Sequence, residues 1–252
     1  MARISVLLSI PALLLATVMG AGAEGADDLW VKGRLLAGED FSGSLSNWVV
    51  EGDADARIEE GRLRFEATTE TDVKKGNIWW RPHFADPIQI EFDYQSATDY
   101  GLTMFWWHSH RRDGRDLLSY KRSGIYDEYV LGEMNGYHIS FHRFKSGVSN
   151  FRKSFGFHMV ATQPDPIPLK DLDNHHITIY NRGNHVRFLV DGKLVHDFHD
   201  EGKPCLIETE WLHEGPCKGT GKAFSEGKIG IRHTQRQTAF YDNLKVYRLV
   251  KP

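Results

Sequence analysis

Residues 175–198 read HHITIYNRGNHVRFLVDGKLVHDF, and this stretch decides the fold class. It contains three short apolar runs, 176–180, 186–190 and 194–198, separated by turns at 182–184 and 191–192. An Asp-Gly pair between two apolar runs is a strong hairpin signal, because both turn residues must adopt positive φ. The stretch therefore predicts consecutive antiparallel strands.

Outward from this stretch, strand signals continue in both directions along the chain. Residues 88–94, IQIEFDY, alternate with period two, and 101–107 and 136–144 do so less strictly. The chain closes on two more runs of this kind, 227–232 and 240–249. Beyond residue 23 no segment keeps a helical period over three turns. The sequence predicts an all-β protein, an antiparallel β-sandwich, with one domain over residues 24–252.

The first 23 residues have the parts of a cleavable secretory signal peptide. Arg3 precedes an apolar run from 4 to 20, and Ala21-Gly-Ala23 supplies the small residues of a cleavage site. A membrane anchor is the weaker reading, because Pro11 interrupts a run shorter than the ~20 residues needed to span a bilayer. We expect a secreted or periplasmic protein with no membrane attachment after cleavage.

The net charge limits the classes of binding partner, and the cysteine content predicts a disulfide. The formal net charge is −3, so no global field favours nucleic acid, and an anionic partner would need a local cluster of Arg and His. The two cysteines are Cys205 and Cys217. In an oxidising compartment we expect them to form a disulfide, worth roughly 3 kcal/mol by loop closure.

The order of the strands resembles the concanavalin-like lectin and glucanase jelly rolls. The middle of the chain resembles the YesU-like family of bacterial jelly rolls, often found among polysaccharide-degrading genes. The motifs that carry this likeness are NIWWRP at 77–82, RSGIY at 122–126, NGYHIS at 135–140 and NFRKSFGF at 150–157. The resemblance covers about residues 30 to 250. It implies a concave groove for an extended glycan and a carbohydrate-active role.

Residues 136–144 are the most informative part of the predicted groove. Strict alternation places His138, Ser140 and His142 on one side and Tyr137 and Arg143 on the other. A row of small polar groups suits the floor of a sugar-binding groove. Two pairs of adjacent tryptophans, 79–80 and 106–107, each place one ring in the core and one outside. We assign the outer positions to Trp80 and Trp107.

Uronate β-elimination is the leading mechanism, because it needs an Arg to neutralise the carboxylate and a His and Tyr to move protons. The predicted catalytic residues are His138, Tyr137, Arg143, Tyr126 and Arg152. The predicted substrate-binding residues are Trp80, Arg81, Trp107, His108, Asn135, Ser140 and His142. The expected partner is a polysaccharide or oligosaccharide, possibly acidic.

Two alternatives stay open. A glycoside hydrolase needs a facing pair of carboxyl groups. We expect Glu91 and Asp93 on a solvated outer face, and no spacing rule selects a pair from Asp127, Glu128 and Glu133. A non-catalytic carbohydrate-binding module would use the same floor without chemistry.

No cofactor is required by any of these mechanisms. The fold resemblance does imply a possible structural calcium where the first and last strands meet, near Glu39, with Asp40 and Asp242 as ligands.

Overall fold

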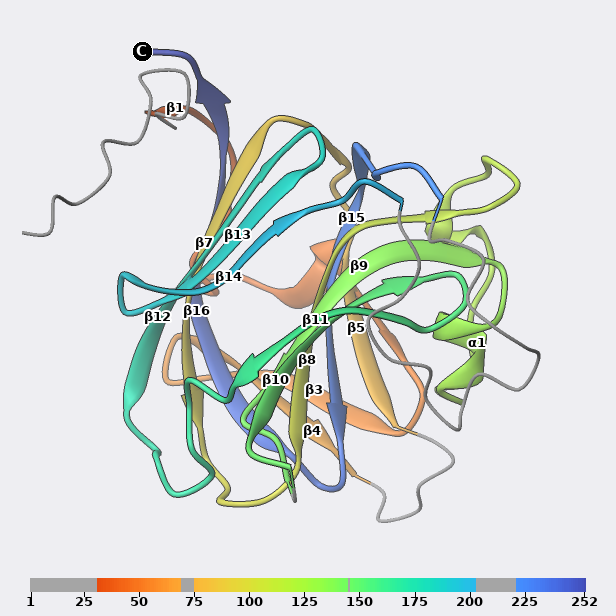
Figure 1. Cartoon of the computed structure of the whole chain (residues 1–252). Helices are drawn as coiled ribbons and strands as arrows, with labels where there is room; N and C mark the ends of the chain where they lie inside the picture. The colour runs from red at the N-terminus through yellow and green to blue at the C-terminus, as the bar shows by residue number, and fades with distance from the viewer. Residues whose placement is uncertain (1–30, 69–74, 145, 203–220) are drawn as a thin grey trace, which may run out of the picture.

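The computed structural model describes residues 31–68, 75–144, 146–202 and 221–252. They form two antiparallel sheets packed face to face, with β7, β12 and β16 in one layer and β8, β9 and β15 in the other (Figure 1). No helix among these residues is long and apolar enough to cross a membrane. The predicted signal peptide and both cysteines lie outside the described residues.

The back sheet contains the residues that opened the sequence analysis. Its order is β14 (Lys193–His199), β13 (His185–Val190), β12 (Asn174–Arg182), β7 (Ile88–Ser96), β16 (Thr238–Val250), β4 (Arg62–Ala67) and β3 (Ala54–Glu59), with β1 (Val31–Glu39) paired to β16. Asp191 and Gly192 have φ of 50° and 73°, as the Asp-Gly turn requires. The predicted run of antiparallel strands is confirmed.

The front sheet carries most of the predicted site. Its order is β11 (His158–Pro164), β10 (Val148–Ser154), β9 (Met134–Phe141), β8 (Leu102–Arg111), β15 (Glu226–Thr234), β5 (Gly76–Trp80) and β2 (Trp48–Glu51), with β6 (Phe84–Ala85) paired to β15. In the described part of the chain, three short helical turns lie in the connections: η2 (Leu45–Asn47), η3 (Leu117–Ser119) and α1 (Asp127–Val130). The all-β sandwich is confirmed.

The main core fills the space between the sheets. Phe92 of the back sheet stacks on Phe105 of the front sheet with ring centres 4.4 Å apart. Ile90 and Ile177 from the back sheet and Ile139 from the front sheet are fully buried in the same cluster. Alternate residues of both sheets therefore meet in one apolar layer, which fixes the register of each strand.

The predicted calcium ligands are engaged locally. The Asp40 carboxylate accepts bonds from the backbone and hydroxyl of Ser42, at 3.0 and 2.7 Å. The Asp242 carboxylate accepts the backbone N–H of Asn243 at 2.7 Å. Among the described residues these carboxylates do not come together in a cluster of three ligand side chains. Calcium at this corner stays a prediction.

Buried histidines make the fold sensitive to acid. Burial lowers the pKa of His196 to about 4, and its Nε2 lies 2.9 Å from the Ser149 hydroxyl. The pKa of His233 falls to about 3 for the same reason. Below pH 6.5 the unfolded chain binds protons that these folded histidines do not, so stability falls with pH over the window from about 6.5 towards 4.

We expect His196 alone to contribute a loss of about 2 kcal/mol in the free energy of unfolding between pH 7 and pH 5. Urea titrations at both pH values measure this loss. His196→Gln keeps a polar partner for Ser149 but cannot titrate, so its loss should be smaller by that amount. Asp86, whose pKa burial raises to about 8, acts in the opposite direction in both proteins. Equal losses in the two proteins would contradict the assignment.

Candidate functional site

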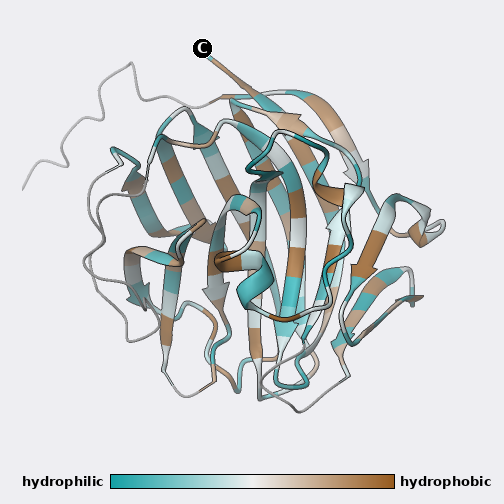
Figure 2. Cartoon of the chain, turned by 90° about the vertical axis from the view of Figure 1, so that its right-hand side faces the viewer, coloured by the Kyte–Doolittle hydropathy of each residue, from teal (hydrophilic) through white to brown (hydrophobic). Residues whose placement is uncertain are grey.

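Part of the outer face of the front sheet is buried beneath a segment that we call the cover, residues 112–133. Leu117, Tyr129 and Val130 of the cover pack with Trp79 and Trp106 in a second apolar cluster, separate from the main core. Figure 2 shows the short helix of the cover lying in front of the strands. The cover therefore turns what would be an open groove into a partly closed face.

A buried ion pair fastens the cover to the sheet. Arg122 forms two parallel bonds to the Glu51 carboxylate, Nε to Oε2 and Nη2 to Oε1, both at 3.0 Å. Glu51 Oε2 also accepts the indole N–H of Trp79 at 2.8 Å and the hydroxyl of Tyr129 at 3.0 Å. Both charged side chains are almost fully buried. Such a satisfied buried pair fixes one arrangement of the cover.

A pocket of about 560 Å³ lies where the cover ends, over β8, β9, β10 and β15. It brings together five of the predicted site residues and one that the sequence analysis missed. The predicted residues are Tyr126, His138, Ser140, Arg143 and Arg152. The additional residue is Arg232 of β15. The side chains predicted for the site lie between residues 79 and 158. Arg232 lies on a strand far beyond that region, and no motif around it indicated a binding role.

The pocket floor follows from strand register. His138 lies opposite Arg152 of β10 and opposite Trp106 of β8, so all three share one face of the sheet. Ser140 lies two residues along the same face and contacts the backbone of Asn150. The predicted His-Ser face of this strand is confirmed for these two residues.

Three arginines at this pocket have no carboxylate partner among the described residues. Arg152 donates to the Phe157 carbonyl at 3.2 Å and lies over the Phe157 ring. Burial, with a smaller contribution from Arg143, lowers the pKa of Arg152 to about 10. Burial also lowers the pKa of Arg143. These three positive charges outnumber the one carboxylate among the described lining residues, Asp127, and the excess favours binding of an anionic group.

Arg232 lies deepest of the three and is fully buried. Its Nη2 donates to the Gly124 carbonyl at 2.9 Å, which ties it to the cover. Its Nε and Nη1 have no hydrogen-bond acceptor among the described residues. Burial lowers its pKa, opposed by the neighbouring phenols of Tyr129 and Tyr126. A buried guanidinium with two unused donor atoms fits the floor of an anion site.

His138 and Tyr126 form the proton-transfer pair of the pocket. The Tyr126 hydroxyl lies 3.4 Å from His138 Nε2. Burial, together with Arg152 and Arg232, lowers the pKa of His138 well below its usual value. Burial raises the pKa of Tyr126 to about 12, although the nearby arginines oppose this. At neutral pH the imidazole is therefore neutral and the phenol is protonated.

The structure places His142 and Arg143, which follow β9, on the opposite faces from those predicted. His142 has φ of 48°, which breaks the alternation, so its ring lies between the sheets. There its Nε2 lies 2.9 Å from the Thr98 carbonyl and 3.1 Å from the Ser96 hydroxyl. The same break sends Arg143 to the pocket side, opposite to the side predicted by strict alternation.

Tyr137 is also corrected. It is buried in the main core, on the opposite face of β9 from the pocket. Its hydroxyl donates to Asp200 at 2.5 Å, and Asp200 also pairs with the fully buried Lys153 at 2.7 Å. Tyr137 therefore belongs to a buried polar network and cannot reach a ligand in the pocket.

Trp80 and Trp107, which were predicted to face outward and bind substrate, instead face the main core. Trp80 stacks on Trp48 in the main core with ring centres 5.9 Å apart. Trp107 donates its indole N–H to Asn181 at 2.8 Å across the sandwich. Their neighbours Trp79 and Trp106 face outward, but the cover buries both. The expected aromatic floor is a structural anchor for the cover.

The other predicted binding residues lie away from the pocket. His108 has φ of 48° at an irregularity in β8, and its buried ring contacts the Phe224 carbonyl at 3.1 Å. Arg81 is exposed and donates to the Ser46 carbonyl. Asn135 lies in a separate hollow, between His110 and the backbone of Phe155.

Among the residues that the structure describes, the carboxylates do not assemble a hydrolytic pair at the pocket. Glu91 pairs with Lys32 at 2.5 Å, and Asp93 accepts a bond from Asn243 at 2.9 Å, both on the back sheet. Their expected outer-face position is confirmed. Asp127 is the single carboxylate among the described residues that line the pocket.

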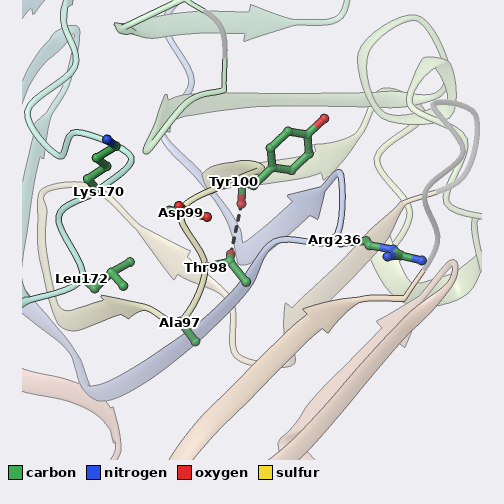
Figure 3. Close-up of a pocket in the computed structure, with 7 residues that line it drawn as sticks. All are labelled: Ala97, Thr98, Asp99, Tyr100, Lys170, Leu172 and Arg236. Carbon is green, nitrogen blue, oxygen red and sulfur yellow. Dashed lines mark hydrogen bonds between the residues drawn. The ribbon is translucent and has the colours of Figure 1, made fainter.

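A second hollow of about 490 Å³ lies among the loops that precede β8 and follow β15 (Figure 3). Lys170, Arg236 and Asp99 line it, and the Thr98 hydroxyl donates to the Tyr100 carbonyl at 3.0 Å. Its charges are mixed, and the described residues that line it include no buried acid-base pair. We therefore place the candidate site in the pocket beside the cover.

Comparisons with known proteins agree with this architecture. The family described as a domain of unknown function, DUF1961, matches residues 36–246. The uncharacterized protein YesU of Bacillus subtilis (strain 168) is 28% identical over 218 residues, which is 82% of this chain and 91% of YesU.

Two solved structures show the same fold. A Bacillus subtilis protein of unknown function with a galectin-like fold superposes with a TM-score of 0.75 at 24% identity, over 89% of this chain and 100% of that chain. The endo-β-1,3-glucanase of Pyrococcus furiosus superposes with a TM-score of 0.54 at 14% identity, over 88% of this chain and 96% of that chain. The predicted family resemblance is confirmed: this protein is a concanavalin-like jelly roll that belongs to the DUF1961 family.

Proposed function

We propose that this protein is exported, binds an acidic glycan in the pocket beside the cover, and cleaves it by β-elimination at a uronate residue. The observation that carries the proposal is the group of three arginines without carboxylate partners, set beside a neutral histidine and a protonated tyrosine. The likeness in fold to a glucanase is consistent with a glycan as the ligand.

The arginines account for the first requirement of the reaction. The proton on C5 of a uronate is weakly acidic, and neutralising the attached carboxylate stabilises the carbanion that forms when it leaves. Arg232 offers two unused donors from the floor, and Arg152 and Arg143 add charge from the side. A bound carboxylate would also offset the positive charge that lowers the pKa of His138, which makes the imidazole a stronger base.

His138 and Tyr126 account for the second requirement. His138 takes the C5 proton, and the electron pair of that bond forms the C4–C5 double bond. The C4–O bond breaks, and Tyr126 gives its proton to the departing oxygen. Proton transfer from His138 to the Tyr126 phenolate across the 3.4 Å contact then restores both groups. Charge and atoms balance without a metal or cofactor.

Incubating the purified protein with a panel of uronate-containing polysaccharides tests the proposal. We expect the ultraviolet absorbance of the unsaturated product to rise with at least one of them, and not with neutral glucans. New reducing ends without that absorbance would show hydrolysis instead. Retained glycan binding with neither signal would show a binding module.

A further inference from the structure

The pocket lies over the front sheet, at the point where the cover ends. Register rows run across the strands: Arg232 lies opposite Met104, Met104 opposite Ser140, Ser140 opposite Asn150, and Asn150 opposite Thr162. A glycan lying along this row would reach Ser140 and then Arg232 as it runs inward from the β11 edge.

The row cannot continue past Arg232. Its next members are Asn77 of β5 and Glu51 of β2, both buried, and Glu51 is paired with Arg122 of the cover. In the neighbouring row, Trp106 and Trp79 are buried against Tyr129 and Val130. The cover is fixed, since the Glu51–Arg122 pair ties it to β2 and the Arg232–Gly124 bond ties it to β15. A chain cannot continue across these strands.

The pocket is also closed on the side where the turn between β10 and β11 lies. The turn between β10 and β11 reaches the cover, where the Gly156 N–H donates to the Val130 carbonyl at 2.8 Å. The rings of Tyr126 and Phe157 meet edge to face at the same place, with centres 5.3 Å apart. The cover and this turn therefore form one continuous wall behind the reacting groups.

The floor on the opposite side is polar, and of its three residues Ser140 and Asn150 are largely buried while Thr162 is exposed. Asn150 accepts a bond from the Thr162 hydroxyl at 3.0 Å, and Ser140 contacts the Asn150 backbone. Thr162 is exposed on β11, which is the edge strand of the sheet. This row offers hydroxyl and amide groups to the sugars that extend away from the pocket.

From this asymmetry we propose that the pocket takes the end of an acidic glycan chain, so that the protein cleaves from a chain end and does not cut within it. The proposal rests on the proposed function. The terminal sugars occupy the pocket against the cover, and the remainder of the chain leaves over Ser140, Asn150 and Thr162.

The test uses whichever uronate polymer gives the unsaturated product, divided into fractions of different chain length and compared at equal mass concentration. We expect the initial rate to rise in proportion to the number of chain ends. We expect unsaturated products of one short length from the first time point, while the viscosity of the polymer hardly falls. Size-exclusion chromatography with ultraviolet detection records the products.

A paired variant tests the exit path. Thr162→Glu places a negative charge where the acidic chain leaves, so we expect KM for long chains to rise several-fold with kcat nearly unchanged. Gln163→Glu adds the same charge at the adjacent exposed residue, whose side chain points to the other face of β11, and should leave KM unchanged.

The outcomes separate the two proposals. Unsaturated products of many lengths with an early fall in viscosity would overturn the chain-end assignment and leave the lyase assignment standing. Equal KM changes in the two variants would overturn the exit path. Absence of unsaturated product from every polymer would overturn the proposed function, and the chain-end assignment with it.

Discussion

Replacing His138 by alanine is expected to lower the rate of uronate elimination by about 10² to 10⁴-fold, the usual contribution of a positioned acid-base group. His138 lies on the pocket floor, 3.4 Å from Tyr126, and no other imidazole lines the pocket among the described residues. Its loss removes both the acceptor for the C5 proton and the route that returns a proton to Tyr126. Product absorbance under saturating substrate measures the effect.

The variant must also be shown to remain folded. The His138 ring packs against Trp106 with centres 4.1 Å apart, so some loss of stability is expected. His138→Gln fills more of this space and should have the same low activity. Retained glycan affinity in both variants would separate lost chemistry from a lost pocket. Wild-type activity in a folded His138→Ala protein would show that the proton acceptor is another group.

Glu91→Gln is the matched control for the hydrolase alternative. Glu91 lies on the back sheet and pairs with Lys32, far from the pocket floor. We expect its activity to equal that of the wild type. A large loss would place the chemistry on the back sheet and contradict the site described above.

Replacing Arg122 by methionine is expected to lower the free energy of unfolding by about 3–5 kcal/mol, because it leaves Glu51 buried without its cation. For a domain of this size, each kcal/mol corresponds to roughly 2–4 °C in Tm, so the expected fall is about 10 °C. Thermal unfolding followed by circular dichroism measures it. Activity should fall as well, since the cover carries Tyr126 and contacts Arg232.

The double variant Glu51→Leu with Arg122→Met gives the internal control. It removes both charges together, so most of the lost stability should return, although Trp79 and Tyr129 each lose a hydrogen-bond partner. Arg57→Met, at an exposed ion pair with Glu59, should change Tm little. A small effect of Arg122→Met would mean that the cover is held mainly by its apolar contacts.

The sequence determined the fold class, the family and the side chains of the site that obey strand alternation. Period-two runs and the Asp-Gly turn are local signals, and local geometry alone decides them. His138 and Ser140 were placed correctly for that reason. Tyr126, from the RSGIY motif, came from the family resemblance and proved to face them.

Only the tertiary structure decided the rest of the site. A single residue with positive φ, His142, exchanged the faces of two side chains, and nothing in the residue type signals that conformation. The choice within each tryptophan pair depended on which face the cover buries, and Arg232 entered from a strand about 90 residues beyond His138. Strand alternation is a property of neighbouring residues, whereas the cover, the bulges and the arginine cluster depend on contacts between distant parts of the chain.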